Sequence, residues 1–397
     1  MWRLGFFFHE MAFGLLSVFI PLYVVSPLIG GSLVDLGIMT SIALFSAIPA
    51  SFFWGYICDK TRRFKLYILL SFISATVLLY LFTFATNVLT FIILYAVMSM
   101  LHVAHEAPKN VLIAEHYSRE KWGKSYALYE GFTEIGWLIG LLLGLFASAT
   151  ALSSNYILLL CSGLNLVAFT LSIFLVADPI LIFERRLVSI EKKIDYTHRG
   201  LDTFSKLIDG VPLREKLKTE SFSAFGLGLV LFSLASSLFF TPLPVFFVQE
   251  LAFPTSMVFM VYMLSSGGAV VGYFLAGRSA ASPEAKAYMR RMVLLRSALV
   301  FSLVVIVNFM VSTSLLASVI LVFLGFAYAF YYILTLSLLM ELIPAGRSGL
   351  FDGLVGLGAA SGSFFGPFLA EMLGFLPQFL IASFIFFLAF LVLKIFT

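Results

Sequence analysis

Long apolar runs separated by short polar segments dominate the chain. A helix that crosses the hydrocarbon core of a bilayer needs roughly 20 mostly apolar residues. The pattern predicts twelve such helices, at 4–25, 35–57, 66–86, 88–112, 124–148, 155–176, 222–248, 255–277, 291–311, 315–342, 348–372 and 375–396. A membrane β-barrel would instead show alternating apolar and polar residues in segments of about ten. These runs are too long and too uniformly apolar for strands, so we expect an all-α membrane protein.

Composition supports this prediction. Hydrophobic residues make up 61% of the chain and charged residues only 12%, whereas soluble domains are nearer ~45–50% and ~25%. So few charges cannot cover a water-soluble surface of 397 residues, but a lipid-facing surface needs no such cover. We therefore expect a multi-pass protein of the cell membrane. The first run carries His9 and Glu10 and lacks a small-residue cleavage site, so we expect it to be retained as a helix.

The placement of positive charge predicts the orientation. All 25 Lys and Arg residues lie in alternate connections or at the helix ends beside them. Cytoplasmic loops carry such an excess of Lys and Arg, which places both termini in the cytoplasm. No long basic run is present, so we expect no nucleic-acid partner. The connections without Lys or Arg are 26–34, 149–154, 249–254, 312–314 and 373–374.

One long polar segment divides the runs into six and six. The predicted domains are an N-terminal bundle at 1–176, a cytoplasmic linker at 177–221 and a C-terminal bundle at 222–397. A weak internal repeat supports two related halves. Three glycines in the fifth run recur 222 residues later in the eleventh, as Gly136, Gly140 and Gly144 and then Gly358, Gly362 and Gly366.

A recognisable motif follows the second run. The segment Gly55-Tyr-Ile-Cys-Asp59-Lys60-Thr-Arg62-Arg63 resembles the loop 2–3 signature of the major facilitator superfamily, G-x-x-x-D-R/K-x-G-R/K-R/K. It departs from that signature where Arg62 replaces the second Gly and Phe64 the last basic residue. The resemblance implies two six-helix bundles that rock around a central cavity by alternating access, in a protein that acts as a monomer.

The resemblance also implies a cytoplasmic latch built from Gly55, Asp59, Lys60 and Arg63. Asp59 would face the N-terminus of the eleventh helix, where free N–H groups and the helix dipole favour an anion. Arg63 would pair with a carboxylate such as Glu341 or Asp352. The alternative is that these charges serve only to set the topology.

The glycines of the fifth run, Gly136, Gly140 and Gly144, are similar to a motif of the family's antiporters. That motif has Pro after the middle glycine, where this chain has Leu141. Close helix packing through small residues is the alternative explanation.

Ionisable residues inside the runs are concentrated in the first half. Each costs ~2.5–3.5 kcal/mol on insertion scales and marks a candidate functional site. Glu134 lies about 16 Å into its helix, near the middle of the membrane, and is the first candidate for proton coupling. A carboxyl group in a low-dielectric cavity can exchange protons near neutral pH. The further candidates are Glu10, Glu106 and Glu130, with His105 as a partner.

A static network is the alternative for these residues. His102, His105, Glu106 and Lys109 form one helical stripe, so Glu106 can pair with Lys109. Glu10 can bond a histidine of the same stripe. Histidine and carboxylate also suit transition metals, but ligands on one helix are not enough, so no metal site is predicted. We find no cofactor motif and no catalytic constellation, so we expect no enzyme.

In the second half of the chain, the apolar runs carry aromatic and hydroxyl side chains in place of the ionisable residues of the first half. Arg296 lies only about a turn into the ninth run, where we expect it to face lipid, so anionic substrates are less expected. An aromatic cavity suits an apolar or aromatic solute, or a lipophilic cation. Tyr328, Tyr331, Tyr332 and Thr335 form one stripe along the tenth run, and helix packing is the alternative explanation for it. The expected cavity residues are Tyr328, Tyr331, Tyr332, Thr335, Ser236, Phe240 and Trp137.

The leading prediction is therefore a secondary transporter of a small organic solute. It would export amphipathic or aromatic compounds, coupled to protons. Uptake of a sugar or another neutral metabolite is the alternative within the same class. A membrane sensor or assembly factor on the same scaffold is the alternative from another class.

Overall fold

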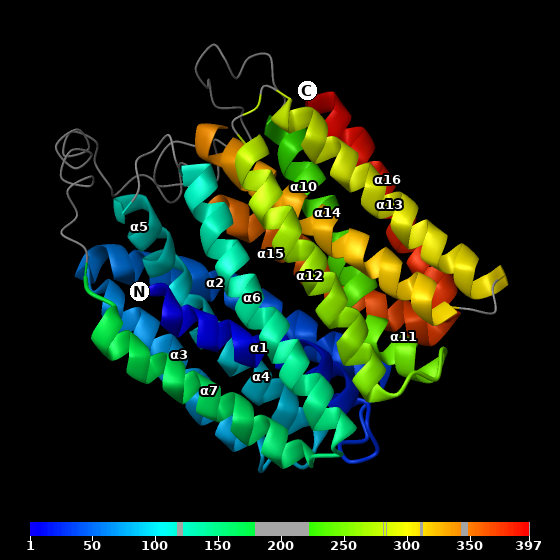
Figure 1. Ribbon diagram of the computed structural model, residues 1–397, viewed down its shortest axis with the longest axis horizontal. Helices are drawn as coiled ribbons and strands as arrows, with labels where there is room; N and C mark the ends of the chain where they lie inside the picture. Colours follow the sequence, from blue (N-terminus) through cyan, green and yellow to red (C-terminus); the bar gives the residue numbers. More distant parts are fainter. Residues whose placement is uncertain are drawn as a thin grey trace.

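The computed structural model describes residues 1–116, 122–178, 222–280, 282, 284–309, 313–342 and 348–396. Within these residues every regular element is a helix, and twelve spans are long and apolar enough to cross a membrane. The predicted twelve-helix membrane fold is confirmed (Figure 1). The helices are α1 (Arg3–Val24), α2 (Leu33–Thr61), α3 (Phe64–Phe82), α4 (Val88–His102), η1 (Val103–His105), α5 (Glu106–His116), α6 (Trp122–Ala149), α7 (Ser154–Leu175), α10 (Phe222–Phe240), α11 (Leu243–Gln249), α12 (Thr255–Ser279), α13 (Ala285–Phe309), α14 (Thr313–Leu342), α15 (Ser348–Leu373) and α16 (Phe375–Phe396).

Two spans that the apolar pattern predicts as continuous helices are interrupted. The seventh span divides into α10 and α11 because Pro242 has no N–H to donate to the carbonyl of Leu238. Gln378 of α16 donates its Nε2–H to that carbonyl at 2.6 Å, so the freed acceptor stays satisfied inside the membrane. The fourth span divides into α4, η1 and α5. Pro108 likewise cannot donate to the carbonyl of Ala104, and the chain tightens into a single 3₁₀ turn there.

The helices form two six-helix bundles. In the first half, α1 packs against α6 and α7, α3 against α7, and α2 against α4. In the second half, α10 packs against α15 and α16, α12 against α14, and α13 against α14 and α16. Residues 179–221 lie outside the described residues, so the boundaries of the predicted linker stay a prediction. The cytoplasmic placement of the termini also stays a prediction.

Two helix pairs join the bundles, and we call them the seams. One seam is α6 against α12 and the other is α2 against α15. In the first seam, Phe259 lies against Gly144 at one end and Ala127 lies against Gly277 at the other. The two helices therefore run antiparallel and stay in contact over most of their length.

Glycines let helices approach closely at equivalent places in the two halves. Gly136 and Gly140 of α6 lie directly on the carbonyls of Phe7 and Met11 in α1. In the second half, Gly358, Gly362 and Gly366 of α15 lie on the carbonyls of Val230, Leu234 and Leu238 in α10. A Cβ at any of these glycines would overlap backbone atoms of the neighbouring helix. The predicted repeat is thus visible as a repeated packing contact.

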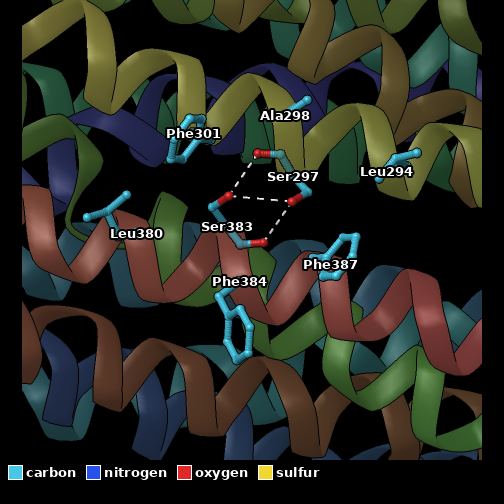
Figure 2. Close-up of a pocket in the computed structure, with 8 residues that line it drawn as sticks. All are labelled: Leu294, Ser297, Ala298, Phe301, Leu380, Ser383, Phe384 and Phe387. Carbon is cyan, nitrogen blue, oxygen red and sulfur yellow. Dashed lines mark hydrogen bonds between the residues drawn. The ribbon is translucent and has the colours of Figure 1, made fainter.

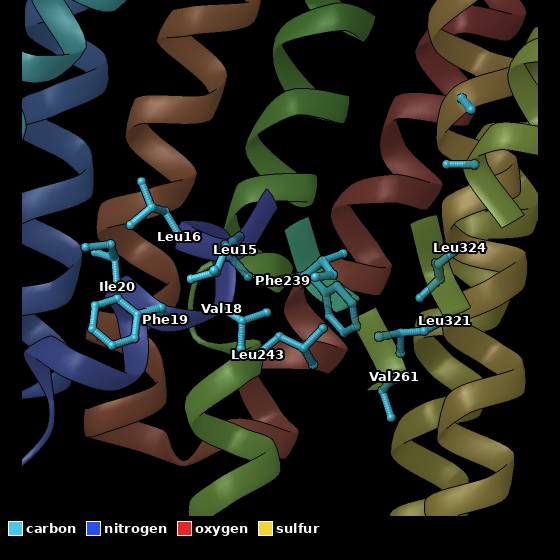
Figure 3. Close-up of a cluster of buried hydrophobic side chains, with 14 of the residues drawn as sticks. Leu15, Leu16, Val18, Phe19, Ile20, Phe239, Leu243, Val261, Leu321 and Leu324 are labelled. Carbon is cyan, nitrogen blue, oxygen red and sulfur yellow. The ribbon is translucent and has the colours of Figure 1, made fainter. Parts of the chain in front are cut away.

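A buried apolar cluster connects the bundles near the end that carries the 25–32 connection. Figure 3 shows its α1 members, among them Val18 and Phe19, beside Leu243 of α11. Helices α1 and α11 are in contact. The cluster continues through Val261 of α12 to Leu321 of α14, and all of these side chains are buried. Apolar packing therefore joins the two bundles at this end of the molecule.

The signature loop departs from its expected sequence at a strained position. Arg62 caps α2 in the left-handed conformation, with φ of 56°. Glycine adopts this conformation without a steric penalty, whereas another residue pays roughly 1–2 kcal/mol. The signature normally has glycine here, and the backbone has kept the conformation although the side chain has changed.

Candidate functional site

Glu134 lies on the seam between α6 and α12. Ser266 of α12 donates its hydroxyl to Glu134 Oε1 at 2.6 Å. The Ser266 side chain is buried and Glu134 is half-buried. The carboxyl group that the sequence ranks first for proton coupling therefore makes its hydrogen bond to the opposite bundle. A change in the distance between the two bundles would change this bond directly.

Glu106 belongs to a network within the first bundle. Its Oε2 accepts from Lys109 Nζ at 2.5 Å, and its Oε1 lies 3.2 Å from His105 Nε2. Lys109 also lies over the ring of Tyr129, 5.6 Å from the ring centroid. The contact between Glu106 and Lys109 is the one that the static-network alternative expected.

Glu10 and Glu130 lie near the same lysine. Both side chains are half-buried. Glu10 interacts electrostatically with Lys109, Glu130, Glu106 and Glu134. Glu10, Glu106 and Glu130 thus interact with Lys109, and Glu134 interacts with Glu10 and Glu130 beside them. We call these four residues, from α1, α5 and α6, the carboxylate layer. One cation among four carboxylates leaves room for bound protons in this layer.

The structure adds two residues to the site, His9 and Asn165, which the sequence analysis did not place there. His9 is fully buried, and its Nδ1 lies 2.6 Å from Asn165 Oδ1 of α7. Its Nε2 lies 3.1 Å from His102 Nδ1. His9 immediately precedes Glu10, so it points in another direction on α1, toward α4 and α7. The sequence signal that could have identified this contact is Asn165, a polar residue within the apolar sixth run.

Arg296 is the largest departure from expectation in the second half. We expected it near a helix end and facing lipid, but its side chain has no exposed surface. Helix α13 begins at Ala285, six residues before the predicted start, which carries Arg296 about 16 Å into the helix. Its guanidinium donates to the Leu324 carbonyl at 3.3 Å and to Ser236 Oγ at 3.4 Å. A mid-depth cation is therefore present.

Aromatic rings surround this cation on several sides. The guanidinium carbon lies 5.1–5.3 Å from four ring centroids, those of Phe232, Phe240, Tyr328 and Phe386. Tyr328 also interacts electrostatically with Glu130 and Glu134 of the first bundle. Ser236 and Phe240, predicted to line a cavity, both contact Arg296, and their place in a substrate cavity stays a prediction. Tyr328 is thus within electrostatic range of both the buried cation and two of the carboxylates.

The other predicted cavity residues divide between two environments. Tyr331 and Thr335 are buried, and Tyr331 stacks on Phe232 at 3.7 Å, as the packing alternative expected. Tyr332 stacks on Tyr328 at 6.0 Å, and Tyr328 is 38% exposed. Trp137 is partly buried, and its backbone contacts Gly14 of α1. Tyr328 and Tyr332 are the two members of the stripe with surface available to a ligand.

The structure describes the side chains of only one half of the predicted latch, the half at the end of α2. Gly55 is half-buried, and Asp59, Lys60 and Arg63 are exposed. Lys60 Nζ lies 5.9 Å from the ring centroid of Tyr56. The side chains of the expected partners Glu341 and Asp352 lie outside the described residues. The latch therefore stays a prediction.

An apolar pocket of about 400 Å³ lies between α13 and α16 (Figure 2). Ser297 and Ser383 each donate a hydroxyl to the other's carbonyl, at 2.8 and 2.9 Å. The rest of the lining is Leu, Ala and Phe side chains. This arrangement fastens two helices of one bundle, and it offers no charged group to a solute.

Comparison with known proteins gives a family and several relatives. Residues 4–367 match the model of the Major Facilitator Superfamily. The multidrug resistance protein MdtG of Citrobacter koseri is 34% identical over 179 residues, which cover 43% of this chain and 42% of that protein. MdtG of Salmonella paratyphi B is 33% identical over 186 residues, covering 45% and 44%. The chain thus matches less than half the length of these curated relatives.

Two solved structures share the fold over the whole chain. The nucleoside transporter NupG has a TM-score of 0.72 at 14% identity, covering 100% of this chain and 98% of that one. The human organic anion transporter MFSD10 has a TM-score of 0.70 at 16% identity, covering 99% and 97%. At these identities the likeness concerns the fold alone.

Proposed function

Because the chain belongs to the major facilitator superfamily, and is thus a multi-pass membrane transporter and not an enzyme, we propose that it exports amphipathic or aromatic compounds in exchange for protons. The observation that carries this proposal is the hydrogen bond from Ser266 to Glu134 across the α6–α12 seam. The partial similarity to MdtG, a protein named for multidrug resistance, favours the same substrate class.

The proposed mechanism links the proton on Glu134 to the seam. A carboxylate accepts a charge-assisted hydrogen bond, which is roughly twice as strong as a neutral one. Deprotonated Glu134 therefore holds α12 through Ser266. Protonation weakens that bond and lowers the free-energy cost of separating the two helices. Binding of a proton thus favours one arrangement of the bundles, and its release favours the other.

The substrate would bind where the bundles meet. Tyr328 and Tyr332 offer ring faces on the second bundle, and the carboxylate layer lies opposite, on the first. Rings and carboxylates together attract a lipophilic cation, through cation–π contact and through charge. A cation that displaces a proton from Glu134 would produce exchange of the two.

The test is transport by the purified chain in proteoliposomes, with a fluorescent lipophilic cation as substrate. We expect a pH gradient to drive the cation across the membrane. Glu134→Gln should reduce pH-driven transport to background while preserving exchange of labelled for unlabelled substrate. Gln cannot release a proton but keeps an oxygen that accepts from Ser266.

The matched control is Glu284→Gln, a carboxylate at the exposed start of α13. It should transport as the unmodified chain does. If Glu134→Gln retained full pH-driven transport, the coupling role would be excluded. Transport of neutral sugars alone, without a pH effect, would reject the exporter.

Arg296 favours a second candidate, transport of an organic anion. Within the described parts of the chain this buried guanidinium makes no ion pair, so a substrate carboxylate could supply one. In the same liposomes, an aromatic carboxylate transported by the unmodified chain but not by Arg296→Gln would support this candidate over the first.

A further inference from the structure

Three histidines from two membrane spans gather beside the carboxylate layer. They are His9 of α1, His102 at the end of α4, and His105 in η1. Each offers a ring nitrogen, and these atoms all lie within 4.8 Å of one another. His9 and His105 are buried to 0% and 1% exposure. Histidine occurs in two of the twelve membrane spans, and the three histidines of those two spans lie together. Their grouping therefore indicates a shared chemical role.

Hydrogen bonds fix which nitrogen of His9 carries its proton. The side-chain amide of Asn165 donates from Nδ2 to the Cys161 carbonyl at 2.9 Å, which turns its Oδ1 toward His9. That oxygen only accepts, so His9 Nδ1, at 2.6 Å, must be the donor. In a neutral imidazole the other nitrogen, Nε2, then presents a lone pair. Nε2 faces His102 and the interior of the cluster.

Hydrogen bonds also place a proton on Nδ1 of His105. The Ser71 hydroxyl donates its one proton to the carbonyl of His102, at 2.9 Å. It must therefore accept from His105 Nδ1, 3.0 Å away. In a neutral ring the lone pair of His105 then lies on Nε2, where it can bind a metal ion. In a protonated ring that nitrogen donates to Glu106 Oε1, 3.2 Å away.

His9 Nε2 and His102 Nδ1 lie 3.1 Å apart, a distance that suits a hydrogen bond between two neutral rings and also two ligands of one metal ion. Two ligand atoms on one zinc ion, each bonded at about 2.0–2.1 Å in a tetrahedron, lie roughly 3.3 Å apart. Metal-binding histidines also donate their second nitrogen to a fixed acceptor, as His9 does to Asn165 and His105 does to Ser71.

We propose that His9, His102 and His105 bind one divalent transition-metal ion of the zinc type. The ligands would be His9 Nε2 and one ring nitrogen each of His102 and His105, with the fourth position left to water. Glu106, which Lys109 holds through Oε2, lies beside His105, and its negative charge would favour a bound cation. Imidazole ligands suit zinc and nickel.

The backbone of the fourth span explains how one span supplies two ligands. In a regular helix, His102 and His105 lie three residues apart, and their rings project in parallel from one stripe. The 3₁₀ turn of η1 alters that spacing, and the two rings meet edge to face at 89°. The metal would therefore fasten α1 to the point at which the fourth span is interrupted. The Glu106 side chain, 38% exposed, provides the way in.

The test is metal binding by the purified, untagged full chain in detergent. After chelation and desalting, we expect it to take up one Zn²⁺ per chain in isothermal titration. With Co²⁺ we expect visible absorption bands of a four-coordinate ion. Asn165→Ala should weaken binding roughly tenfold to hundredfold, because it removes only the outer partner of His9. His9→Gln should weaken it further and abolish the cobalt bands.

The matched control is His116→Gln, at the last residue of α5 and about 16 Å along the helix from His105. It should leave stoichiometry, affinity and cobalt spectrum unchanged. Each variant must elute as a single species, so that a folding defect is seen separately. Absence of stoichiometric binding by the unmodified chain, or equal loss in His9→Gln and His116→Gln, would overturn the proposal.

Discussion

At the scale of single residues, Arg296 shows how a charge can be kept inside an apolar bundle. Four rings from three helices, α10, α14 and α16, surround its guanidinium, and its two hydrogen bonds are long. Each cation–π contact of a desolvated cation contributes about 2 kcal/mol, and together they offset the cost of burial. Shape is as important as charge here, because a planar guanidinium can present its faces to rings.

The ring contacts of Arg296 predict an order of stability among its variants. Arg296→Lys should unfold at a lower temperature than Arg296→Met, by a difference equivalent to about 1–2 kcal/mol. Lysine keeps a charge that is more strongly hydrated and cannot stack, whereas methionine removes the charge and fills much of the space. Thermal unfolding of both purified variants would measure the difference. If the lysine variant matched the unmodified chain, charge alone would explain the site.

The sequence predicts the carboxylates of the site better than their partners. Glu106 and Lys109 are three residues apart on one helix, so their contact follows from helical geometry. The cluster of His9, His102 and Asn165 requires α1, α4 and α7 to meet, which no local pattern encodes. Arg296 was misplaced because the apolar pattern starts later than the helix, whose first turns are basic and polar.

At the scale of elements, the contact between α1 and α6 depends on glycine. Gly140 lies on the Met11 carbonyl, a backbone atom that cannot turn aside as a side chain can. Close approach of this kind supplies much of the association energy between membrane helices, because lipid provides no hydrophobic driving force.

Gly140→Ala should therefore destabilise the protein by about 1–3 kcal/mol, the usual cost of overpacking. The matched control is Gly163→Ala on α7, where a Cβ would meet no atom within 4 Å. That control should be neutral or slightly stabilising, since alanine is the better helix former. Thermal unfolding would measure both. Equal effects of the two substitutions would show that helix propensity, rather than the α1–α6 contact, controls the result.

Element boundaries were predictable because bilayer thickness sets the length of every span. Most predicted ends fall within a few residues of the observed ones. The interruptions at 103–105 and 241–242 were missed, because a proline inside an apolar run does not change its hydrophobicity. It changes only the hydrogen bonding of the preceding turn.

At the scale of the whole molecule, the two seams determine how the bundles can move. Alternating access requires each seam to separate at one end while the other end stays closed. The α6–α12 seam has Ala127 and Gly277 in contact at the end that carries Lys124 and Arg278. A covalent bond there should stop the cycle in one state.

We expect the double variant Ala127→Cys, Gly277→Cys to lose transport on oxidation and to regain it on reduction. A Cβ on Gly277 would lie 2.7 Å from the Ala127 Cβ, so a slight shift allows a disulfide. The matched control is Ser297→Cys with Ser383→Cys, whose hydroxyls are 3.4 Å apart within one bundle (Figure 2). Transport by liposomes would measure both pairs. Continued transport by the fully crosslinked seam pair would reject the rocking motion.

The apolar cluster around Val18, Phe19 and Leu243 has a consequence for the energy supply of the cell. Protons cross membranes along chains of water, and a dry apolar barrier breaks such chains. If the chain exchanges bulky compounds for protons as proposed, it must also act as an insulator for most of its cycle. The packing in Figure 3 would then keep the proton gradient from discharging through the protein.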